Sequence, residues 1–308
     1  MMTDGTATVT IRDVTPRDGL QAGTPVSSAA RAELAIALAD AGLAHVEAAS
    51  FVSAKAVPTM AGADEVFGLL PECDTVWWAL VPNARGAEAA LAAGVRNITV
   101  TVSASTEYSE KNVRRSTAEA LAGLAEIAAV SQPAGADLDV VVSCAFGSPF
   151  DDVISPSPVI EVVDAALRAM PGARITLADT TGTATPRRIA AVFAELAGEA
   201  HTDLGLHLHD TRGTALANAL WAFEHGVHRF DTATGGLGGS PFAPGAGGNL
   251  ATEDLVLVLE DLGIPTGIDL DAILRIADSL SSLVGHTVPS RTAAAGPLPF
   301  FDSQRPLA

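Results

Sequence analysis

Apolar and polar positions along the chain follow two alternating patterns. Short runs rich in β-branched residues, which favour strands, are separated by alanine-rich segments with helical spacing of apolar residues. The predicted strands are Thr8–Val14, His45–Ser50, Thr75–Val81, Asn97–Ala104, Asp137–Phe146, Arg174–Thr180, Leu204–Asp210 and Arg229–Gly236. The predicted helices are Ser28–Ala41, Thr59–Leu70, Asn83–Ala93, Thr117–Val130, Ser157–Met170, Pro186–Gly198, Thr214–His225, Thr252–Leu262 and Leu270–Val284.

This alternation predicts the fold class. Strands separated by helices are parallel and are joined by right-handed crossovers. Eight such units favour a closed barrel over an open doubly wound sheet. The 308 residues contain no internal duplication and no linker that would divide them. We therefore predict a single α/β domain over residues 1–308, a (β/α)8 TIM barrel with additional C-terminal helices and a loosely packed tail from about residue 287.

Composition narrows the class of protein further. Hydrophobic residues make up 48% of the chain and aromatic residues only 5%, which suits helices packed around parallel strands. The formal net charge of −18 argues against nucleic acid or a membrane surface as a partner. Neither Cys73 nor Cys144 lies in a CxxC pattern, so a zinc ribbon or a disulfide scaffold is not expected. No secretory signal and no bilayer-spanning run is visible, and we expect a cytoplasmic protein.

Polar residues gather where the predicted strands end, which is where barrels of this type place their active sites. His207 and His209 are two apart on a strand, so their imidazoles point to the same face. Such a pair suits a divalent metal that is completed by oxygen ligands, and Asp18 after the first strand supplies a carboxylate. The alternative for the pair alone is one core histidine and one hydrogen-bonding histidine.

Three further charged residues end strands on the same side. Arg17 is a fixed cation that could hold a carboxylate or polarise a carbonyl, or form a surface ion pair. Glu47 and Asp179 could each accept a proton, orient a neighbouring group or cap the following helix. The sequence does not choose among these roles.

Two features mark the rim of the predicted barrel. The glycine-rich stretch from Gly235 to Asn249 contains neither a Walker motif nor a dinucleotide fingerprint, and we interpret it as a loop that covers the barrel mouth. The only two lysines, Lys55 and Lys111, both follow strands at the catalytic end. Lys111 lies close to Arg114 and Arg115, so this basic patch could receive the phosphates of a large ligand.

Together these segments resemble one family of metal-dependent barrel lyases, the 3-hydroxy-3-methylglutaryl-CoA (HMG-CoA) lyase family. The resemblance extends from about Ile11 to about Asp269. The stretches that carry it are PRDGLQ, EAASFVSAKAVP, SEKNVRRS, VSCAFGSPF, LADTTGTATP, GLHLHDTRGTALAN and GGLGGSPFAPGAGGNLATEDLV.

The resemblance implies a lyase that cleaves a short 3-hydroxyacyl-CoA, most simply HMG-CoA, to acetyl-CoA and a keto acid. It implies a divalent metal, Mg²⁺ or Mn²⁺, on Asp18, His207, His209 and Asn249, and it places Arg17 on the reacting oxygens of the substrate. Coenzyme A enters as part of that substrate, and a homodimer is expected. The remaining site residues that the resemblance implies are Gln21, Glu47, Lys111, Asn112, Asp179 and, in support, Glu253.

One position departs from the family pattern. The family loop usually reads GGCP, with the cysteine as proton carrier, whereas Ser240 stands there in this chain. An alcohol exchanges protons near neutrality far less readily than a thiol with a pKa of about 8.5. Ser148 replaces a second family cysteine, and Cys144 remains in a strand, where we expect it to be packed rather than reactive.

Several functions stay open because of this serine. Ser240 or a water could move the proton in a lyase for a related substrate. The metal site could instead run an aldol or Claisen condensation, or the serine could be an engineered substitution. A catalytically degenerate barrel that only binds acyl-CoA is the alternative of another class, and the complete set of predicted metal ligands argues against it.

Overall fold

The chain folds into a closed eight-stranded barrel in a computed structural model that describes residues 9–151, 155–196, 203–239 and 247–296. Every strand is parallel to the next in chain order, and β8 closes the barrel against β1. This confirms the predicted (β/α)8 TIM barrel. The strands are β1 (Thr10–Asp13), β2 (His45–Ser50), β3 (Val76–Leu80), β4 (Asn97–Ser103), β5 (Asp137–Ser143), β6 (Arg174–Asp179), β7 (Leu204–Leu208) and β8 (Arg229–Thr232).

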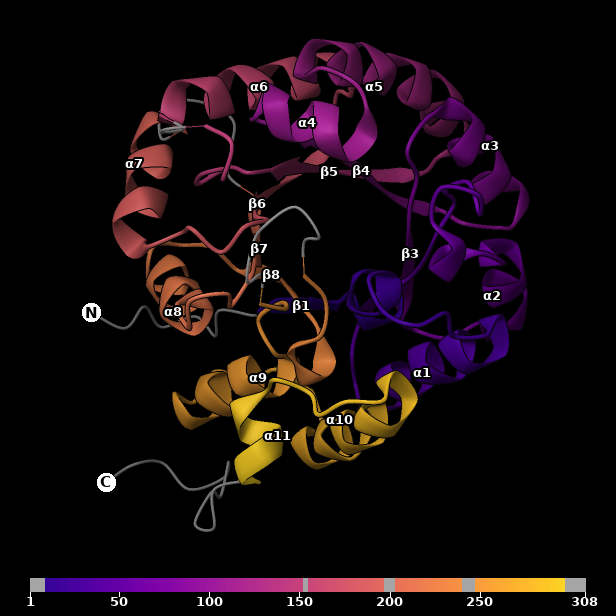
Figure 1. The fold of residues 1–308 in the computed structure, drawn as a ribbon, viewed down its shortest axis with the longest axis vertical. Coiled ribbons are helices and arrows are strands. Elements are labelled where there is room, and N and C mark those ends of the chain that lie inside the picture. The colour runs from indigo at the N-terminus through magenta and orange to yellow at the C-terminus, as the bar shows by residue number, and fades with distance from the viewer. Residues whose placement is uncertain (1–8, 152–154, 197–202, 240–246, 297–308) are drawn as a thin grey trace.

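The helices form a ring around the barrel (Figure 1), and α9 and α10 occupy the part of the ring between α8 and α1. They are α1 (Ser28–Asp40), α2 (Ala63–Leu69), α3 (Ala84–Ala92), α4 (Thr106–Val113), α5 (Thr117–Ser131), α6 (Pro156–Ala169), α7 (Pro186–Leu196), α8 (Ala215–Glu224), α9 (Thr252–Asp261), α10 (Leu270–Val284) and α11 (Arg291–Ala295). Within the described ranges, none of these helices is long and apolar enough to span a membrane.

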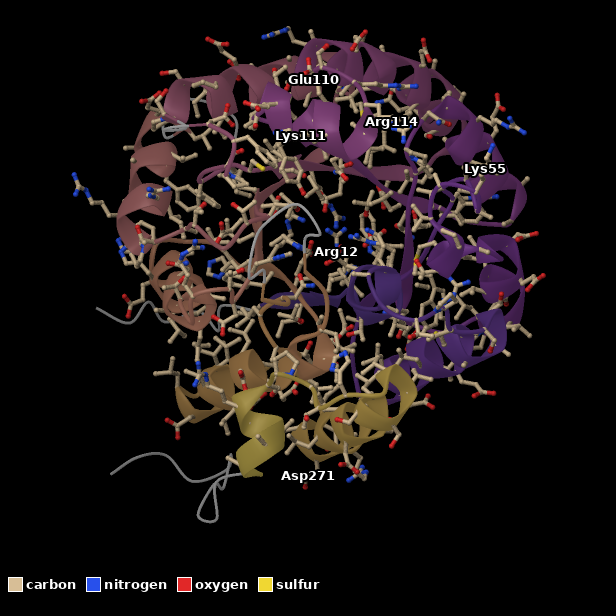
Figure 2. The ribbon with its side chains drawn as sticks, viewed as in Figure 1. Arg12, Lys55, Glu110, Lys111, Arg114 and Asp271 are labelled. Atoms are coloured by element: carbon tan, nitrogen blue, oxygen red, sulfur yellow. The ribbon has the colours of Figure 1, made fainter. Side chains whose placement is uncertain are left out.

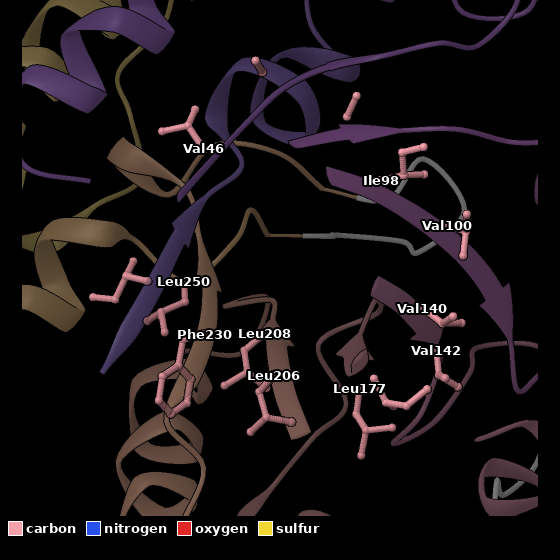
Figure 3. Close-up of a cluster of buried hydrophobic side chains, with 14 of the residues drawn as sticks. Val46, Ile98, Val100, Val140, Val142, Leu177, Leu206, Leu208, Phe230 and Leu250 are labelled. Carbon is pink, nitrogen blue, oxygen red and sulfur yellow. The ribbon is translucent and has the colours of Figure 1, made fainter. Parts of the chain in front are cut away.

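The two faces of each strand have different environments. In β4, Ile98, Val100 and Val102 belong to the apolar core between the barrel and the helices, and Figure 3 shows Ile98 and Val100 in this cluster with Val140 of β5. The residues between them face the barrel interior, because Arg12 of β1 donates a hydrogen bond across the barrel to Thr99. The interior is therefore polar, and the hydrophobic core lies outside the barrel wall.

Local sequence signals explain where several helices begin. The Ser27 side chain accepts a hydrogen bond from the Ala30 N–H at the start of α1. At α5, Ser116 and Glu119 form a reciprocal capping box. Helix α4 was not predicted because its sequence, TEYSEKNV, has no apolar stripe, although the Ser105 side chain caps it.

The C-terminal segment differs from the loosely packed tail expected after residue 287. Val288, Ser290 and Thr292 are buried. The Ser290 hydroxyl and the Thr292 N–H both donate to Asp254 of α9. Within residues 287–296 the expectation of a loose tail was wrong, because these polar contacts hold the segment against α9.

Candidate active site

A cluster of potential metal ligands lies at the C-terminal end of the barrel, as the sequence predicted. His207 lies in β7, and His209 is the first residue after the end of β7. Both histidines are buried. Asp18 joins them from the turn after β1, and one ligand atom from each of the three residues lies within 4.8 Å of the others. Two strands of the barrel thus bring together residues that are 189 to 191 positions apart in the sequence.

Asp18 reaches the cluster through an unusual turn. Residues Thr15–Gly19 (η1) form one turn of π-helix, and the Val14 carbonyl accepts hydrogen bonds from the N–H groups of Arg17, Asp18 and Gly19. Single π-helical turns occur frequently at functional sites. This turn places two consecutive charged side chains, Arg17 and Asp18, over the barrel mouth.

Asn249 completes the cluster from the glycine-rich stretch. Its backbone forms an antiparallel bridge with His209, and its side-chain Nδ2 donates to Asp18 Oδ2 at 2.8 Å. A Cβ atom on Gly248 would lie 1.8 Å from the Gly236 carbonyl oxygen, so the two arms of the stretch approach too closely for any residue but glycine. Asn249 Oδ1 is buried and has no hydrogen-bond partner among the residues that the structure describes. A cation beside it would satisfy this oxygen.

A carboxylate that the sequence did not single out fixes His207. His207 Nδ1 lies 3.2 Å from Asp231 Oδ2. Asp231 accepts two hydrogen bonds from Arg12, at 2.8 and 2.9 Å, and the Arg12 charge overcomes burial to hold the pKa of Asp231 well below its usual range. Nδ1 must therefore be the donor, and the Nε2 lone pair of His207 faces His209 Nε2 at 3.1 Å. A bound metal needs an imidazole in this tautomer.

The charges of the cluster also suit a divalent cation. Burial alone would raise the pKa of Asp18, but Arg17, His207 and His209 together lower it to about 2. Burial and the neighbouring His207 lower the pKa of His209 to about 4. Near neutral pH Asp18 is thus an anion and His209 is neutral, as ligands must be. The mixed nitrogen and oxygen donors fit Mn²⁺ and Mg²⁺.

Arg17 lies between two carboxylates. Its Nε donates to Glu47 and its Nη1 donates to Asp18. Burial would lower the pKa of Arg17, but Glu47 and Asp18 raise it, so the guanidinium stays charged. Glu47 is fully buried, and its Oε1 has no hydrogen-bond partner among the described residues. The predicted residues Arg17 and Glu47 are therefore brought together beside Asp18.

Asp179 ends β6 and stands in the same barrel mouth. Its Oδ1 accepts a hydrogen bond of 2.7 Å from the Thr183 N–H, whereas its buried Oδ2 lacks a partner among the described residues. Burial outweighs these hydrogen bonds and raises the pKa of Asp179 to about 6. Asp179 can therefore exchange a proton near neutral pH.

The structure adds two hydroxyl groups that the sequence did not indicate. A β-bulge between Glu47 and Ala49 pairs Glu47 with Trp78 and Ser50 with Leu80, so Ser50 comes to the same inward face as Glu47. The Ser50 hydroxyl is buried, and no residue in the described part of the chain hydrogen-bonds to it. Thr101 alternates with core residues in β4 yet is exposed, so the interior opens to solvent there. The alternation of Thr and Ser with Ile and Val in β4 is a signal that could have revealed Thr101.

The remaining predicted residues form no hydrogen bond or ion pair with the cluster among the described residues. Lys111 and Asn112 are exposed on α4, and Figure 2 shows Lys111 well apart from Lys55 and from Arg12 in the centre of the barrel. Lys111 Nζ pairs with Glu107 at 3.1 Å and lies 3.6 Å from the centre of the Phe150 ring. The backbone carbonyl of Gln21 accepts a hydrogen bond from Thr59.

The glycine-rich stretch is described only at its two ends, and Ser240 lies outside the described residues. Glu253 supports this stretch from α9, since both of its carboxylate oxygens accept from the Gly235 N–H. Burial is the main cause that raises the pKa of Glu253 to about 7. The structure thus gives Glu253 a supporting contact with the loop, as the resemblance implied.

Cys144 is packed rather than reactive. It is fully buried in the left-handed backbone region (φ 57°) directly after β5, and burial raises its pKa to about 12. Ser148 accepts hydrogen bonds from the Ser105 hydroxyl and the Phe150 N–H. Neither residue supplies the thiolate that the family loop provides.

Comparisons with known proteins identify the family of the chain. The family model HMGL-like matches residues 8–280. An (R)-citramalyl-CoA lyase from Chloroflexus aurantiacus is 42% identical, with 94% of this chain and 95% of that protein covered. A hydroxymethylglutaryl-CoA lyase from Pseudomonas mevalonii is 40% identical, with 93% and 96% covered.

A solved structure is also similar to this chain along nearly its whole length. The structure of an HMG-CoA lyase from Acinetobacter baumannii in complex with coenzyme A and 3-methylmalate matches with a TM-score of 0.92. The two chains are 39% identical, and the match covers 98% of this chain and 99% of that one. The similarity therefore includes the whole barrel and not a single motif.

Proposed function

The chain belongs to the HMGL-like family of carbon–carbon lyases, and we propose that it cleaves a short 3-hydroxyacyl-CoA in a divalent-metal-dependent reaction. The leading candidate substrate is HMG-CoA, which would give acetyl-CoA and acetoacetate. The observation that carries the proposal is the largely buried cluster of Asp18, His207, His209 and Asn249, in which the Asn249 oxygen lacks a partner among the described residues. Such unsatisfied buried acceptors are rare unless a ligand completes them.

Each part of the cluster has a proposed role. Mg²⁺ or Mn²⁺ on these four residues would supply Lewis acidity toward the hydroxyl and carboxylate oxygens of the substrate. Arg17 keeps its charge and is held on one side by Glu47 and Asp18. Its Nη2 has no partner within the described ranges, so this atom can donate to a substrate oxygen whose negative charge grows as the bond breaks.

Cleavage also needs two proton transfers. The tertiary hydroxyl must lose a proton as the C2–C3 bond breaks, and C2 of the acetyl-CoA enolate must gain one. We assign the first transfer to Asp179, because its pKa of about 6 and its unpartnered Oδ2 suit a general base. Glu47 instead orients Arg17, which already occupies one of its oxygens.

Ser240 is the proposed site of the second transfer, either directly or through a water. The test is Ser240→Cys, which restores the thiol of the family loop. If the family route operates, the variant should release acetyl-CoA from HMG-CoA faster than the native protein, up to the factor of about 10²–10⁴ that general acid–base catalysis contributes. A native protein that is already fast, with no gain from the thiol, would show that another group carries this proton.

A second candidate substrate is (R)-citramalyl-CoA. It is favoured by the 42% identity to a citramalyl-CoA lyase and by the 3-methylmalate bound to a related structure. Both candidates share a hydroxyl and a carboxylate that one metal could bind together, but their keto acid products differ. Citramalyl-CoA would give pyruvate in place of acetoacetate.

The deciding experiment is a substrate panel. Protein loaded with Mn²⁺ or Mg²⁺ is incubated with 3-hydroxyacyl-CoA thioesters, and acetyl-CoA and the keto acid are both quantified. We expect release from HMG-CoA or citramalyl-CoA that stops when the metal is chelated. Product formation only from acetyl-CoA plus a keto acid would favour a condensing enzyme. Tight acyl-CoA binding with no turnover in either direction would favour the degenerate binding barrel.

We also propose that the protein is a homodimer. Leu262 after α9 and Leu283 of α10 are large apolar residues that are 56% and 39% exposed on the C-terminal helices. Light scattering should give twice the chain mass of 31.3 kDa. A mass of one chain at micromolar concentration would contradict the proposal.

A further inference from the structure

A second polar pocket lies at the opposite end of the barrel from the metal-ligand cluster. It is small and partly open to solvent, and it is lined by Thr10, Arg12, His45, Trp78, Arg174, Arg229, Phe230 and Asp231. Thr10, His45, Arg174 and Arg229 are the first residues of β1, β2, β6 and β8. The pocket therefore opens at the N-terminal end of the strands, away from the catalytic mouth.

Two of its three arginines are neutralised by carboxylates. Arg12 contacts Asp231 at 2.8 Å and Asp139 at 2.9 Å. Arg229 pairs with Asp203 at 2.9 Å and lies 3.6 Å from Asp139. These carboxylates are thus already engaged with Arg12 and Arg229.

Arg174 is different. Within the described ranges its guanidinium has no carboxylate within ion-pair distance and no hydrogen bond, and it lies beside the Trp78 ring, with its carbon 5.5 Å from the ring centre. The guanidinium carbon of Arg12 lies 5.0 Å from the centre of the same ring. Two guanidinium groups thus lie beside one ring, and Arg174 is the one arginine of the pocket without a carboxylate contact among the described residues.

His45 provides a second free donor. Its Nδ1 accepts a hydrogen bond of 3.1 Å from Trp78 Nε1, so its proton is on Nε2. Burial and then the charges of Arg174, Arg12 and Arg229 lower the pKa of His45 to about 4, against the opposing effect of Asp231. His45 is therefore neutral at physiological pH and offers one N–H in a region of positive potential.

We propose that this pocket binds one small inorganic anion, held by the Arg174 guanidinium and the His45 Nε2–H and bordered by the Thr10 hydroxyl. The three donors come from strands that begin at the same end of the barrel, and the limited volume excludes a large ligand. A metal cation is excluded by the arginines. The anion would pair with the one guanidinium of the pocket that contacts no carboxylate among the described residues. This site is independent of the proposed lyase reaction.

Anion-specific stabilisation tests the proposal. Thermal unfolding of the whole protein is followed in sodium chloride, sodium bromide or sodium phosphate, and in the sodium salt of a bulky sulfonate buffer at equal ionic strength. At about 100 times its dissociation constant, a bound anion raises the ratio of folded to unfolded protein about 100-fold. We expect a saturable gain with at least one of the small anions and none with the sulfonate.

Matched variants locate the effect. Arg174→Gln should lose the saturable gain, whereas Arg275→Gln, which removes one exposed positive charge from α10, should keep it. Equal stability in all salts, or an undiminished gain in Arg174→Gln, would overturn the proposal. If Arg174→Gln does not fold, crystals of the native protein grown in bromide decide the matter. An anomalous peak between Arg174 and His45 supports the site, and its absence at saturating bromide refutes it.

Discussion

At the C-terminal end of the barrel several buried polar atoms lack partners, whereas in the barrel centre and towards its N-terminal end most buried charges are paired. Asn249 Oδ1, Glu47 Oε1 and Asp179 Oδ2 all face the mouth unsatisfied, within the described part of the chain. Below them, Arg12 joins Asp231 and Asp139 in a closed network. Both regions are equally buried, so burial alone does not distinguish them.

This difference distinguishes polar groups that are available to a ligand from charges that stabilise the fold. An unsatisfied buried acceptor destabilises the fold by about 1–3 kcal/mol, and a protein keeps several of them together only where a ligand satisfies them. Paired charges in the centre need no ligand, and they fix the side chains above them. Asp231 shows this connection, since it pairs with Arg12 and also contacts His207.

The largest expected effect comes from removing a ligand at the mouth. His209→Ala should weaken Mn²⁺ binding by more than the factor of about 10–100 typical for the supporting residues of a metal site, and should abolish lyase activity. The thermal stability of the metal-free variant is measured alongside, because the buried His209 ring also packs against His207. Calorimetric titration with Mn²⁺ measures the loss. His286→Ala, at an exposed histidine, is the control. Unchanged Mn²⁺ affinity in His209→Ala would contradict the proposed metal site.

The next effect concerns the carboxyl group of Glu253, which accepts hydrogen bonds but is disfavoured in its ionised form by burial. The pKa of Glu253 is raised by burial to about 7 in the folded protein, from an ordinary value of 4.5. Its protonated form therefore stabilises the fold fully below pH 4.5, and this contribution is lost as the pH rises through 7. Over that window the free energy of unfolding should fall by up to about 3 kcal/mol.

Glu253→Gln should flatten this pH dependence, because an amide does not ionise. Urea unfolding of both proteins at several pH values between about 5 and 8 measures the difference. Glu126→Gln, at an exposed position of α5, controls for the loss of one acidic residue. An identical slope in Glu253→Gln and native protein would mean that the folded protein tolerates the carboxylate at Gly235.

Sequence patterns predicted the site residues whose positions follow from strand periodicity and from the ends of strands. The two histidines share a strand face, and Asp18 follows a strand end, so periodicity and topology were enough to bring them together. Asp231 was not found because its role depends on Arg12, which is 219 positions away in the chain. Ser50 was not found because the bulge in β2 reverses the alternation that sequence reasoning assumes.

A smaller effect tests whether the paired centre serves the mouth. Asp231→Asn should weaken Mn²⁺ binding by about 10–100-fold, since the amide can hold His207 less firmly in the required tautomer. Asp203→Asn removes the exposed carboxylate that pairs with Arg229 and should leave the metal affinity unchanged. Equal metal affinity in Asp231→Asn and native protein would show that the paired network does not support metal binding at the mouth.

The smallest effect is expected at the rim, where solvent weakens every charge. Lys111 is 44% exposed on its side chain and already pairs with Glu107, so a contact with the phosphates of coenzyme A would contribute only about 1 kcal/mol. Lys111→Ala should therefore raise the KM for the acyl-CoA about fivefold and leave kcat unchanged. The increase should shrink at high salt, because screening acts on exposed charges. Steady-state kinetics at two ionic strengths measure this, with Arg275→Ala as the control for an exposed positive charge far from the mouth. An unaltered KM at low salt would contradict a contact with coenzyme A and leave Lys111 with its contacts to Glu107 and Phe150.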